Sequence, residues 1–487
     1  MRLYKKEGNT VLILSFPKEE AEKGDYLQIE DPKASKSLIA QVIDVQFANV
    51  PGILEELLRD SSGYEHIYGE DLDPLDVGSQ VTYIQDAKIL LCKIRGTIQD
   101  DKLSIDNSWL PSRSQSKIKK LPTESLLKLV RIGEELSINL GQTKELSQLT
   151  IDARDLDGKL NIVTGKKETG KSHLSKLLVL GLIDHGAPVV VLDLNGEYGS
   201  LGLSSKDEKT KHYDRICMLT PGASFKVTLA QTHLRVMMNI LVHALGLPGT
   251  STREFRRIWQ YLNERGTLTL QALGETIQNW KCNQFIRDAL FSRYYSLLNS
   301  SFFTDNVAEA TTLEDSFSKI RDGGALVVNL KDVAAVDRQI VVEYMLGKLV
   351  ELLLQWKIRA VFLFAEEAHL YLRETYWEDI VTRMRHFGVF TTFVTNQPDT
   401  IKENIYRQAD NIFLFNFTNE NDLETVSRAA RVDAETVKLI ARDLPSRQCL
   451  ILGKAVRDFP VVAKVRALDI QTLGQTRFFF TKIARTL

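Results

Sequence analysis

The sequence predicts an α/β protein with a mostly parallel sheet, a small β-rich domain before that sheet and a helical insertion within it. Three observations lead to this prediction. From residue 151 onward, short apolar segments alternate with helical patterns, which is typical of a parallel sheet covered by helices. Residues 1–115 contain strand-like segments separated by turn residues. Residues 201–320 are dominated by helical periodicity.

The bulk composition excludes several classes of protein. The chain has 487 residues, 44% of them hydrophobic and 26% charged, with a formal net charge of −1. Such a chain can bury a large core, and its length allows about three domains. Because the charge is near zero, any contact with nucleic acid depends on local basic patches. The four scattered cysteines argue against a disulfide framework or a zinc ribbon. No apolar segment approaches the ~20 residues of a membrane span, so we expect a cytoplasmic protein.

The N-terminal third is expected to hold two parts. The strand patterns of residues 1–115 predict a small β-barrel, interrupted at residues 51–78 by one inserted helix. Residues 116–150 follow as a polar linker and a helix, with helical periodicity over residues 123–140.

The core is expected in two segments that flank the insertion. Apolar strand patterns place its first part at residues 151–200 and its second part at residues 321–465. The helical insertion over residues 201–320 lies between them. Residues 466–487 are predicted to form a C-terminal arm that packs on the chain or on a neighbouring subunit.

A glycine-rich motif lies between a strand pattern and a helix pattern. It reads GKKETGKS over residues 165–172, which is the GxxxxGK[ST] spacing of a phosphate-binding loop. The alternative is a glycine turn that matches by chance, but the flanking strand and helix favour a RecA-like P-loop core. Backbone N–H groups of such a loop bind phosphate oxygens, and the helix N-terminus adds positive charge. The motif therefore predicts ATP and Mg²⁺ as cofactors, with Lys171 on the β/γ-phosphates and Ser172 on Mg²⁺. The residues expected at the nucleotide are Gly165, Lys167, Thr169, Gly170, Lys171, Ser172 and His173.

Two carboxylates end an apolar strand pattern at residues 360–366. Hydrolysis of a nucleotide needs a metal ligand and a group that orients water, so we assign Glu366 to Mg²⁺ and Glu367 to the water. In isolation, such a pair more often caps the N-terminus of a helix, and it is the P-loop in the same chain that favours the catalytic assignment. His369 either couples nucleotide state to movement or is a hydrogen-bonded helix residue.

Two further candidates flank the next strand pattern. Asn396 follows that strand and could sense the γ-phosphate, although a turn before Pro398 is an equal alternative. Arg385 precedes the strand and could stabilise charge on the nucleotide of a neighbouring subunit. The alternative for Arg385 is a solvated basic helix face.

Taken together, these motifs resemble those of the HerA-type ATPases of the HerA/FtsK superfamily, over nearly the whole chain. The β-rich N-terminus and the helical insertion are similar to those of the family as well. The matching segments are Gly165–Ser172, Asp193–Tyr198, Glu366–His369, Arg385–Gly388 and Thr395–Pro398.

The resemblance implies a DNA helicase or translocase type of ATP hydrolase. It implies a ring-shaped hexamer that moves double-stranded DNA through its pore, with nucleotide at the subunit interfaces. It also implies a partner, either a NurA-type nuclease in DNA repair or a sirtuin-type or nuclease effector in antiphage defence. Basic residues of the insertion (Lys281, Arg287, Arg293) or of residues 206–211 are candidates for DNA contact.

Three departures from the family pattern are visible. Leu194 and Asn195 replace a Pro-His pair, and Asn396 stands where the family often has Gln. The family often has an arginine before the P-loop strand that acts on the neighbour's nucleotide. Lys159 occupies that position here and keeps the charge but lacks the planar guanidinium.

Two alternative functions remain open at this point. The ring could be a nucleotide-regulated scaffold that activates an effector enzyme without moving DNA. The chain could also be a secretion-type ATPase that pumps DNA or protein at a membrane, although it has no apolar membrane segment.

Overall fold

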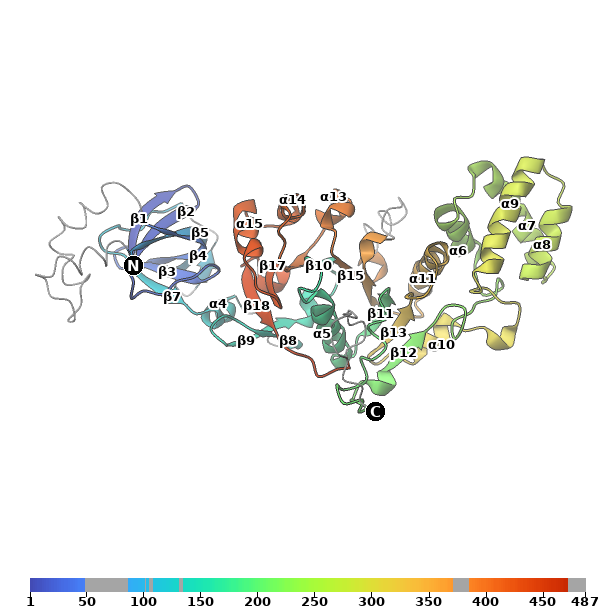
Figure 1. The fold of residues 1–487 in the computed structure, drawn as a ribbon, viewed down its shortest axis with the longest axis horizontal. Coiled ribbons are helices and arrows are strands. Elements are labelled where there is room, and N and C mark those ends of the chain that lie inside the picture. Colours follow the sequence, from blue (N-terminus) through green and yellow to red (C-terminus); the bar gives the residue numbers. More distant parts are fainter. Residues whose placement is uncertain (49–85, 101, 105–107, 131–134, 371–384, 472–487) are drawn as a thin grey trace, which may run out of the picture. The chain divides into compact units, whose positions relative to one another are not determined.

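The computed structural model describes residues 1–48, 86–100, 102–104, 108–130, 135–370 and 385–471 (Figure 1). The chain forms two compact units, each assembled from separate stretches of sequence. The first unit comprises residues 1–152, 165–170 and 411–466, and the second comprises residues 153–164, 171–410 and 467–487. The predicted division at residue 115 therefore does not separate the units, because C-terminal strands fold with the N-terminal ones.

An antiparallel sheet forms the N-terminal part of the first unit, as the strand patterns predict. Its strand order is β1-β2-β5-β4-β3-β7, and β6 pairs with the end of β5. Its core contains fully buried side chains such as Val11, Leu27 and Leu90. Among the described residues no ladder joins β1 to β7, so closure into a barrel stays a prediction, and the predicted inserted helix lies outside the described residues. The strands are β1 (Arg2–Glu7), β2 (Thr10–Ser15), β3 (Tyr26–Asp31), β4 (Lys36–Phe47), β5 (Lys88–Gln99), β6 (Lys102–Ser104) and β7 (Lys117–Leu121).

A second group of antiparallel strands completes the first unit, in the order β16-β17-β18-β8-β9. The predicted helix over residues 123–140 is wrong in its second half, where β8 begins at Ser137. Buried Ile138 and Leu140 alternate with more exposed residues there, so the pattern has a period of two. The elements are α4 (Thr123–Leu129), β8 (Ser137–Gln142), β9 (Gln148–Asp152), β16 (Asn411–Leu414), α14 (Glu420–Ala429), α15 (Ala434–Arg442), β17 (Gln448–Gly453) and β18 (Val461–Val465).

Hydrogen bonds and ion pairs hold the two groups of strands together within the first unit. The buried hydroxyl of Tyr26 donates to the carbonyl of Pro460 at 2.8 Å, and the Gln41 amide donates to the same oxygen at 2.9 Å. Arg95 of β5 binds Asp433, the N-cap of α15, at 2.8 Å. These contacts explain why residues 411–466 belong to the same unit as the N-terminus.

A parallel sheet forms the centre of the second unit, with the order β12-β13-β11-β14-β15-β10. Apart from the edge strand β12, which is partly exposed, its strands are almost wholly buried, as expected of a sheet with both faces covered. β12 lies inside the predicted helical insertion, which is therefore wrong in its first part. The short segment ICML pairs with β13 and is too short for its period to identify it. The strands are β10 (Asn161–Thr164), β11 (Pro188–Asp193), β12 (Ile216–Leu219), β13 (Gly324–Asn329), β14 (Val361–Glu366) and β15 (Val389–Thr395).

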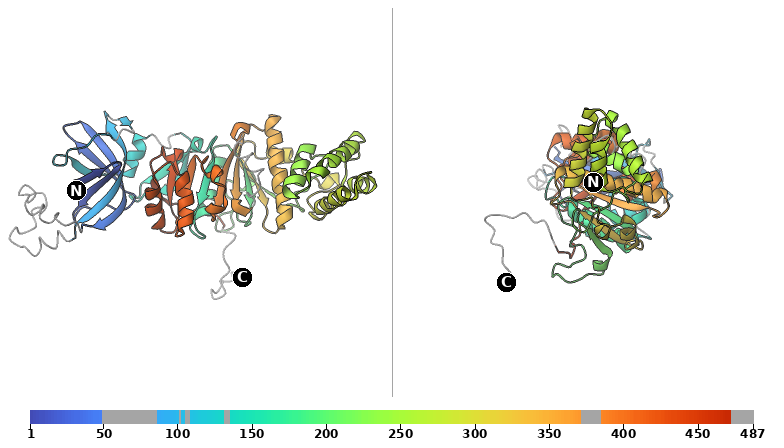
Figure 2. Two further views of the ribbon diagram at one scale, coloured as in Figure 1. Left: turned by 90° about the horizontal axis from the view of Figure 1, so that it is seen from above. Right: turned by 90° about the vertical axis from the view of Figure 1, so that its right-hand side faces the viewer.

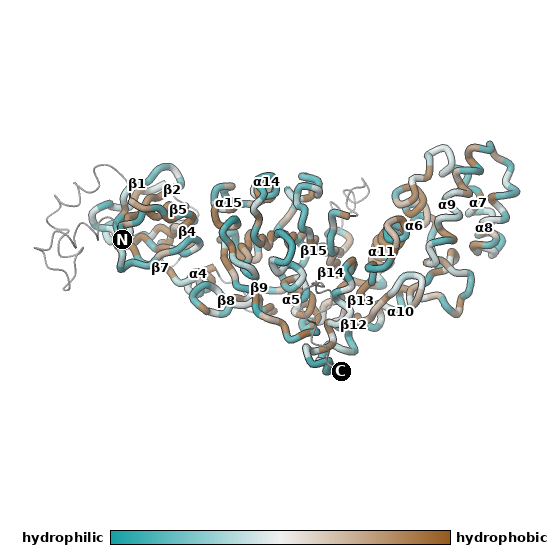
Figure 3. The backbone as a smooth tube through the Cα atoms, in the orientation of Figure 1, coloured by the Kyte–Doolittle hydropathy of each residue, from teal (hydrophilic) through white to brown (hydrophobic). Residues whose placement is uncertain are grey.

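Helices of the second unit either pack on this sheet or form a separate group. α5 is apolar on nearly all sides, as expected of a helix buried against the sheet. Helices α7, α8 and α9 stand side by side in Figures 1 and 2 and fill much of the predicted insertion. Figure 3 shows hydrophobic residues along β14, β15 and α11. Within the described ranges, no helix combines the length and hydropathy that crossing a membrane requires. The helices are α5 (Lys171–Asp184), α6 (Leu234–Asn239), α7 (Gly249–Glu264), α8 (Leu270–Asn279), α9 (Gln284–Asn299), α10 (Leu313–Ser318), α11 (Ala335–Leu354) and α13 (Glu403–Tyr406).

Candidate functional site

The carboxyl ends of three adjacent parallel strands meet at one edge of the sheet in the second unit. In the register of β10 and β15, Thr164 lies opposite Thr395, and the Thr164 hydroxyl donates to the Thr395 carbonyl at 3.1 Å. In the register of β14 and β15, Glu366 lies opposite Val394. Open α/β sheets bind ligands at this edge. The residues that follow β10, β14 and β15 are the glycine loop, the acid pair and the amide that the sequence singled out.

The glycine loop packs closely against residues of its own unit. A Cβ at Gly165 would lie 2.4 Å from Cβ of Phe415, so only glycine fits there. Gly170 has a φ of 117°, which side chains rarely allow, and a Cβ there would approach the ring of Phe415. The backbone N–H of Arg447 donates to the carbonyl of Thr169 at 2.9 Å. Lys167 is exposed. The loop therefore has a fixed backbone conformation, as binding of phosphate through N–H groups requires.

The predicted residues after the loop form the first turn of α5. Lys171 is buried, whereas Ser172 and His173 are partly exposed. The N–H groups of a first helical turn have no partners within the helix and carry partial positive charge. The site residues Lys171 and Ser172 thus lie where an anionic phosphate is stabilised by the helix itself.

Glu366 is buried at the end of β14, with 2% of its surface exposed. Burial, together with the nearby carboxylates of Glu197, Glu367 and Asp193, raises the pKa of Glu366 to about 8, although a hydrogen bond from the Tyr198 hydroxyl acts in the opposite direction. A carboxylate in such a place is costly to ionise unless a cation accompanies it. This environment is what a metal ligand needs.

Two polar groups at the same edge lack hydrogen-bond partners among the described residues. They are Oε2 of Glu367 and Oδ1 of Asn396, and both atoms are buried. Glu367 also has a φ of 50°, a left-handed conformation that costs about 1 kcal/mol or more in a residue with a side chain. Nδ1 of His369 lies 3.4 Å from Oε2 of Glu367, within the range of an ion pair, but makes no hydrogen bond to it. Buried acceptors that make no hydrogen bond, next to strained backbone, indicate a site that a ligand or water completes.

The residues present fit a magnesium ion that arrives with a nucleotide. Mg²⁺ prefers oxygen ligands and is usually held by one or two carboxylates plus phosphates. The hydroxyl of Ser172 and the carboxylate of Glu366 are oxygen donors of this kind, and both belong to the second unit.

Arg385 and Lys159 lie at the opposite edge of the sheet from the acid pair. Arg385 precedes β15 and its guanidinium is 3.9 Å from the buried carboxylate of Asp410. The same Asp410 accepts a hydrogen bond from the backbone of Leu160, beside Lys159. Because β15 spans seven residues, about 23 Å of strand separates Arg385 from Asn396. The structure does not bring Arg385 or Lys159 together with Glu367 of the same chain.

Sequence reasoning gave no role to two residues that support this site. Phe415 packs on both glycines of the loop, and Tyr198 donates to Glu366. In the sequence, Phe415 is one of several residues of an apolar strand pattern, and no motif distinguishes it from the others. Tyr198 belongs to the segment Asp193–Tyr198 that carries the family resemblance, and that position was the available signal.

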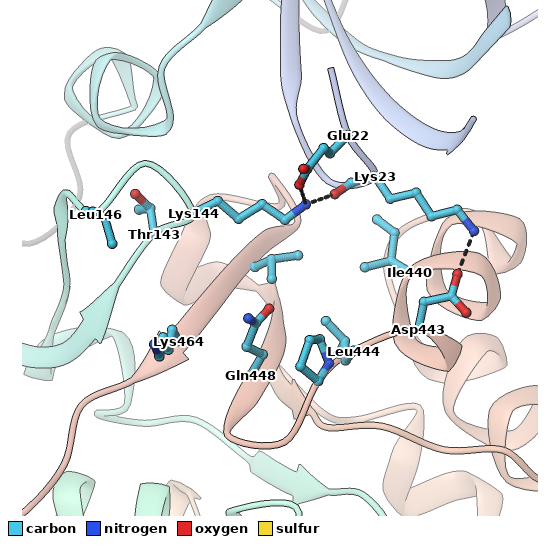
Figure 4. Close-up of a pocket in the computed structure, with 12 residues that line it drawn as sticks. Glu22, Lys23, Thr143, Lys144, Leu146, Ile440, Asp443, Leu444, Gln448 and Lys464 are labelled. Carbon is cyan, nitrogen blue, oxygen red and sulfur yellow. Dashed lines mark hydrogen bonds and ion pairs between the residues drawn. The ribbon is translucent and has the colours of Figure 1, made fainter. Parts of the chain in front are cut away.

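A separate cavity of about 420 Å³ lies within the first unit and contains none of the predicted nucleotide residues. In Figure 4, Lys23 and Lys144 point toward acidic residues in or beside this cavity. Lys23 binds Asp443 at 2.6 Å, and Lys144 binds Glu22 at 3.4 Å. Because these lysines are already paired, we assign no ligand to the cavity.

One family model matches the chain over residues 138–349, and it describes the central domain of the helicase HerA. This match includes the glycine loop but ends before the acid pair. Two relatives extend further. The chain is 22% identical to the DNA double-strand break repair helicase HerA of Saccharolobus solfataricus, over 70% of this chain and 72% of that protein. It is also 22% identical to a probable helicase of Methanocaldococcus jannaschii, over 94% of this chain and 88% of the relative.

Solved structures with a similar fold include a plasmid coupling protein and VirB4. The plasmid coupling protein TrwB bound to a non-hydrolysable ATP analogue superposes with a TM-score of 0.53 at 12% identity, covering 73% of this chain and 94% of TrwB. VirB4 of Thermoanaerobacter pseudethanolicus gives a TM-score of 0.52 at 15% identity, covering 69% and 98%. TrwB has also been solved with ADP and Mg²⁺. At these identities the likeness shows that the chain shares the fold of these proteins.

Proposed function

We propose that this chain, which is a HerA-type ATPase of the HerA/FtsK superfamily, couples ATP hydrolysis to the translocation of double-stranded DNA as a hexameric ring. The observation that carries the proposal is the edge where β10, β14 and β15 end. There one strand, β15, lies between β14, which ends in the acid pair, and β10, which leads into the glycine loop. A carboxylate oxygen of Glu367 is buried and makes no hydrogen bond among the described residues.

The residues at this edge divide the work of phosphoryl transfer to water. The loop N–H groups and the Lys171 ammonium would hold the β- and γ-phosphates of a bound nucleotide. Ser172 and Glu366 would hold Mg²⁺, and the ion would supply positive charge to the phosphate oxygens. Glu367 accepts a hydrogen bond from the attacking water and orients it in line. Asn396 supplies an amide that senses the γ-phosphate.

Arg385 and Lys159 fit a role across a subunit interface. Both lie at the edge of the sheet away from the acid pair of their own chain, so the nucleotide on which they would act is that of another subunit. A positive side chain supplied in trans stabilises transition-state charge and raises hydrolysis by about 10³ to 10⁵. This arrangement makes a lone subunit a poor ATPase and motivates the hexamer.

Two of the residues proposed from sequence for DNA contact are already hydrogen-bonded within the chain. Arg287 donates to the carbonyl of Trp280, and Arg293 donates to the carbonyls of Leu245 and Gly246. These two guanidiniums therefore stabilise the helical group and are poor candidates for phosphate contacts. Lys281 and Lys206 are exposed and remain candidates.

Duplex-stimulated hydrolysis is the experiment that tests this function. ATP turnover with Mg²⁺ is expected to rise when double-stranded DNA is added, and DNA affinity should fall steeply with salt as phosphate contacts release counterions. Displacement of a protein block from the end of a duplex would then report translocation. Turnover that is insensitive to DNA, in an intact oligomer that activates a co-purifying enzyme, would favour the scaffold function. The partner we expect is a NurA-type nuclease or a defence effector.

A further inference from the structure

The loop after β11 places a tyrosine hydroxyl on the buried acid of the candidate site. Tyr198 is fully buried, and its hydroxyl donates to Oε1 of Glu366. A buried tyrosine hydroxyl needs a hydrogen-bond partner, but a backbone carbonyl would serve as well. Here the partner is instead the carboxylate that the proposed function assigns to Mg²⁺.

Tyr198 is held in place by the strand that precedes it. Asp193, the last residue of β11, is wholly buried and accepts hydrogen bonds from the backbone N–H groups of Glu197 at 3.0 Å and Tyr198 at 2.9 Å. These bonds close the loop onto its own strand end. Because β11 is paired with β14 in parallel register, the tyrosine and Glu366 emerge at the same edge of the sheet.

The same loop is connected to the helix that begins at Lys171. The ammonium of Lys176, on α5, binds the Glu197 carboxylate at 3.1 Å and lies 5.6 Å from the centre of the Tyr198 ring. Both members of this ion pair are largely buried, which strengthens it relative to a surface pair. The first-turn residues that hold phosphate and the acid that holds the metal are thus linked through one ion pair and one hydroxyl.

We propose that Tyr198 is a positioning residue for hydrolysis: its hydroxyl fixes one carboxylate oxygen of Glu366, so that the other is oriented toward the magnesium site. This inference rests on the proposed function and assigns Tyr198 no contact with substrate. A carboxylate at the end of a strand has several rotamers, and a fixed rotamer lowers the entropic cost of binding the cation. The hydroxyl acts as a donor to the acid and leaves the metal's own ligands unchanged.

Substitution of Tyr198 by phenylalanine separates positioning from packing, because the ring is kept and only the hydroxyl is lost. With Mn²⁺ as the probe and a non-hydrolysable ATP analogue present, electron paramagnetic resonance measures the free cation. We expect Tyr198→Phe to weaken Mn²⁺ binding about tenfold, the usual weight of a hydrogen bond to a charged group. In turnover assays kcat at limiting Mg²⁺ should fall similarly, while KM for ATP changes less than about threefold because the loop is intact.

Tyr344→Phe is the matched control, since Tyr344 is an equally buried tyrosine of the same unit that packs against Phe225 and Phe302. It should leave the Mn²⁺ affinity unchanged. If Tyr198→Phe does not fold, Glu197→Gln weakens the support of the same loop and should lower Mn²⁺ affinity in the same direction. Wild-type Mn²⁺ affinity in the folded Tyr198→Phe variant, with active wild-type enzyme, would overturn the inference and leave the proposed function standing. A wild-type protein that neither binds the Mn²⁺ nucleotide nor hydrolyses ATP would overturn both.

Discussion

Nδ1 of His369 lies 3.1 Å from the hydroxyl of Thr395, the last residue of β15. This contact joins the segment after the acid pair to the end of the adjacent strand, where Asn396 follows. The same nitrogen lies 3.4 Å from Oε2 of Glu367. His369 is therefore placed to transmit a change at one strand end to the other.

We expect His369→Ala to lower kcat by roughly three- to tenfold, because Glu367 loses a neighbour that limits its orientations. Nucleotide affinity should stay within about twofold of wild type, since the loop and α5 are untouched. Single-turnover hydrolysis and equilibrium binding of a fluorescent ATP analogue measure the two quantities. Equal losses in both would mean that His369 supports the fold and has no part in coupling.

Glu367→Gln should abolish turnover and preserve binding. The amide has the same shape but cannot polarise the attacking water, so we expect kcat to fall by about 10² to 10⁴. The variant should retain ATP long enough to be isolated as a complex, which nucleotide analysis of the gel-filtered protein detects. Substantial ATP turnover by the Glu367→Gln variant would show that Glu367 is not the catalytic residue.

Gly165→Ala tests the packing of the phosphate loop. Its new methyl group would lie 2.4 Å from Cβ of Phe415, so the loop or β16 must shift. We expect a loss of about 1–3 kcal/mol in stability and at least a tenfold weaker nucleotide affinity. Gly249→Ala is the control, because a Cβ there meets no atom within 4 Å. Similar behaviour of the two variants in thermal unfolding and nucleotide titration would contradict the packing argument.

The Arg95–Asp433 ion pair should stabilise the first unit in a pH-dependent way. Burial opposes ionisation of Asp433, but the Arg95 charge and hydrogen bonds from Arg95 and Thr436 outweigh it and lower the pKa of Asp433. The stabilisation is therefore fully present above about pH 4, the ordinary pKa of aspartate, and is lost as the pH falls through the lower pKa of the folded state.

Asp433→Asn keeps the N-cap of α15 but removes this charge, so we expect a loss of about 1 kcal/mol at pH 7. The difference from wild type should shrink below pH 4. Urea unfolding at several pH values measures it, with Asp443→Asn, whose pair with Lys23 is more exposed, as a milder control. A loss that persists unchanged in acid would exclude the ion pair as its cause.

The sequence was sufficient to predict the strands and the loop that end at the candidate site, because these have a fixed local pattern. The glycine spacing of residues 165–172 and the apolar runs ending at Glu366 and Thr395 each predict an element from residues close in sequence, and the structure aligns those strand ends. The family match covers the glycine loop and ends before Glu366 and Thr395. What the sequence could not supply were contacts between distant segments, such as Phe415 against Gly165 or Tyr198 on Glu366.

Errors of fold prediction have a similar cause. The stretch at residues 123–140 changes from helix to hairpin because β8 pairs with β18, more than 300 residues away. β12 forms a strand because it pairs with β13 at the edge of the sheet. Its four residues are too few for the hydrophobic pattern to predict a strand. Arg385 lies at the edge of the sheet away from the acid pair because it precedes β15. No sequence motif predicts this position.

The measurement that bears most directly on this account is steady-state ATP hydrolysis with Mg²⁺, with and without duplex DNA, for wild type and Lys171→Ala. We predict that the wild type consumes ATP and that DNA accelerates it, whereas Lys171→Ala loses at least 100-fold of the activity and still assembles to the wild-type size, because only the phosphate contact is removed. Absence of hydrolysis in the wild type, or equal hydrolysis by the variant, would contradict the account.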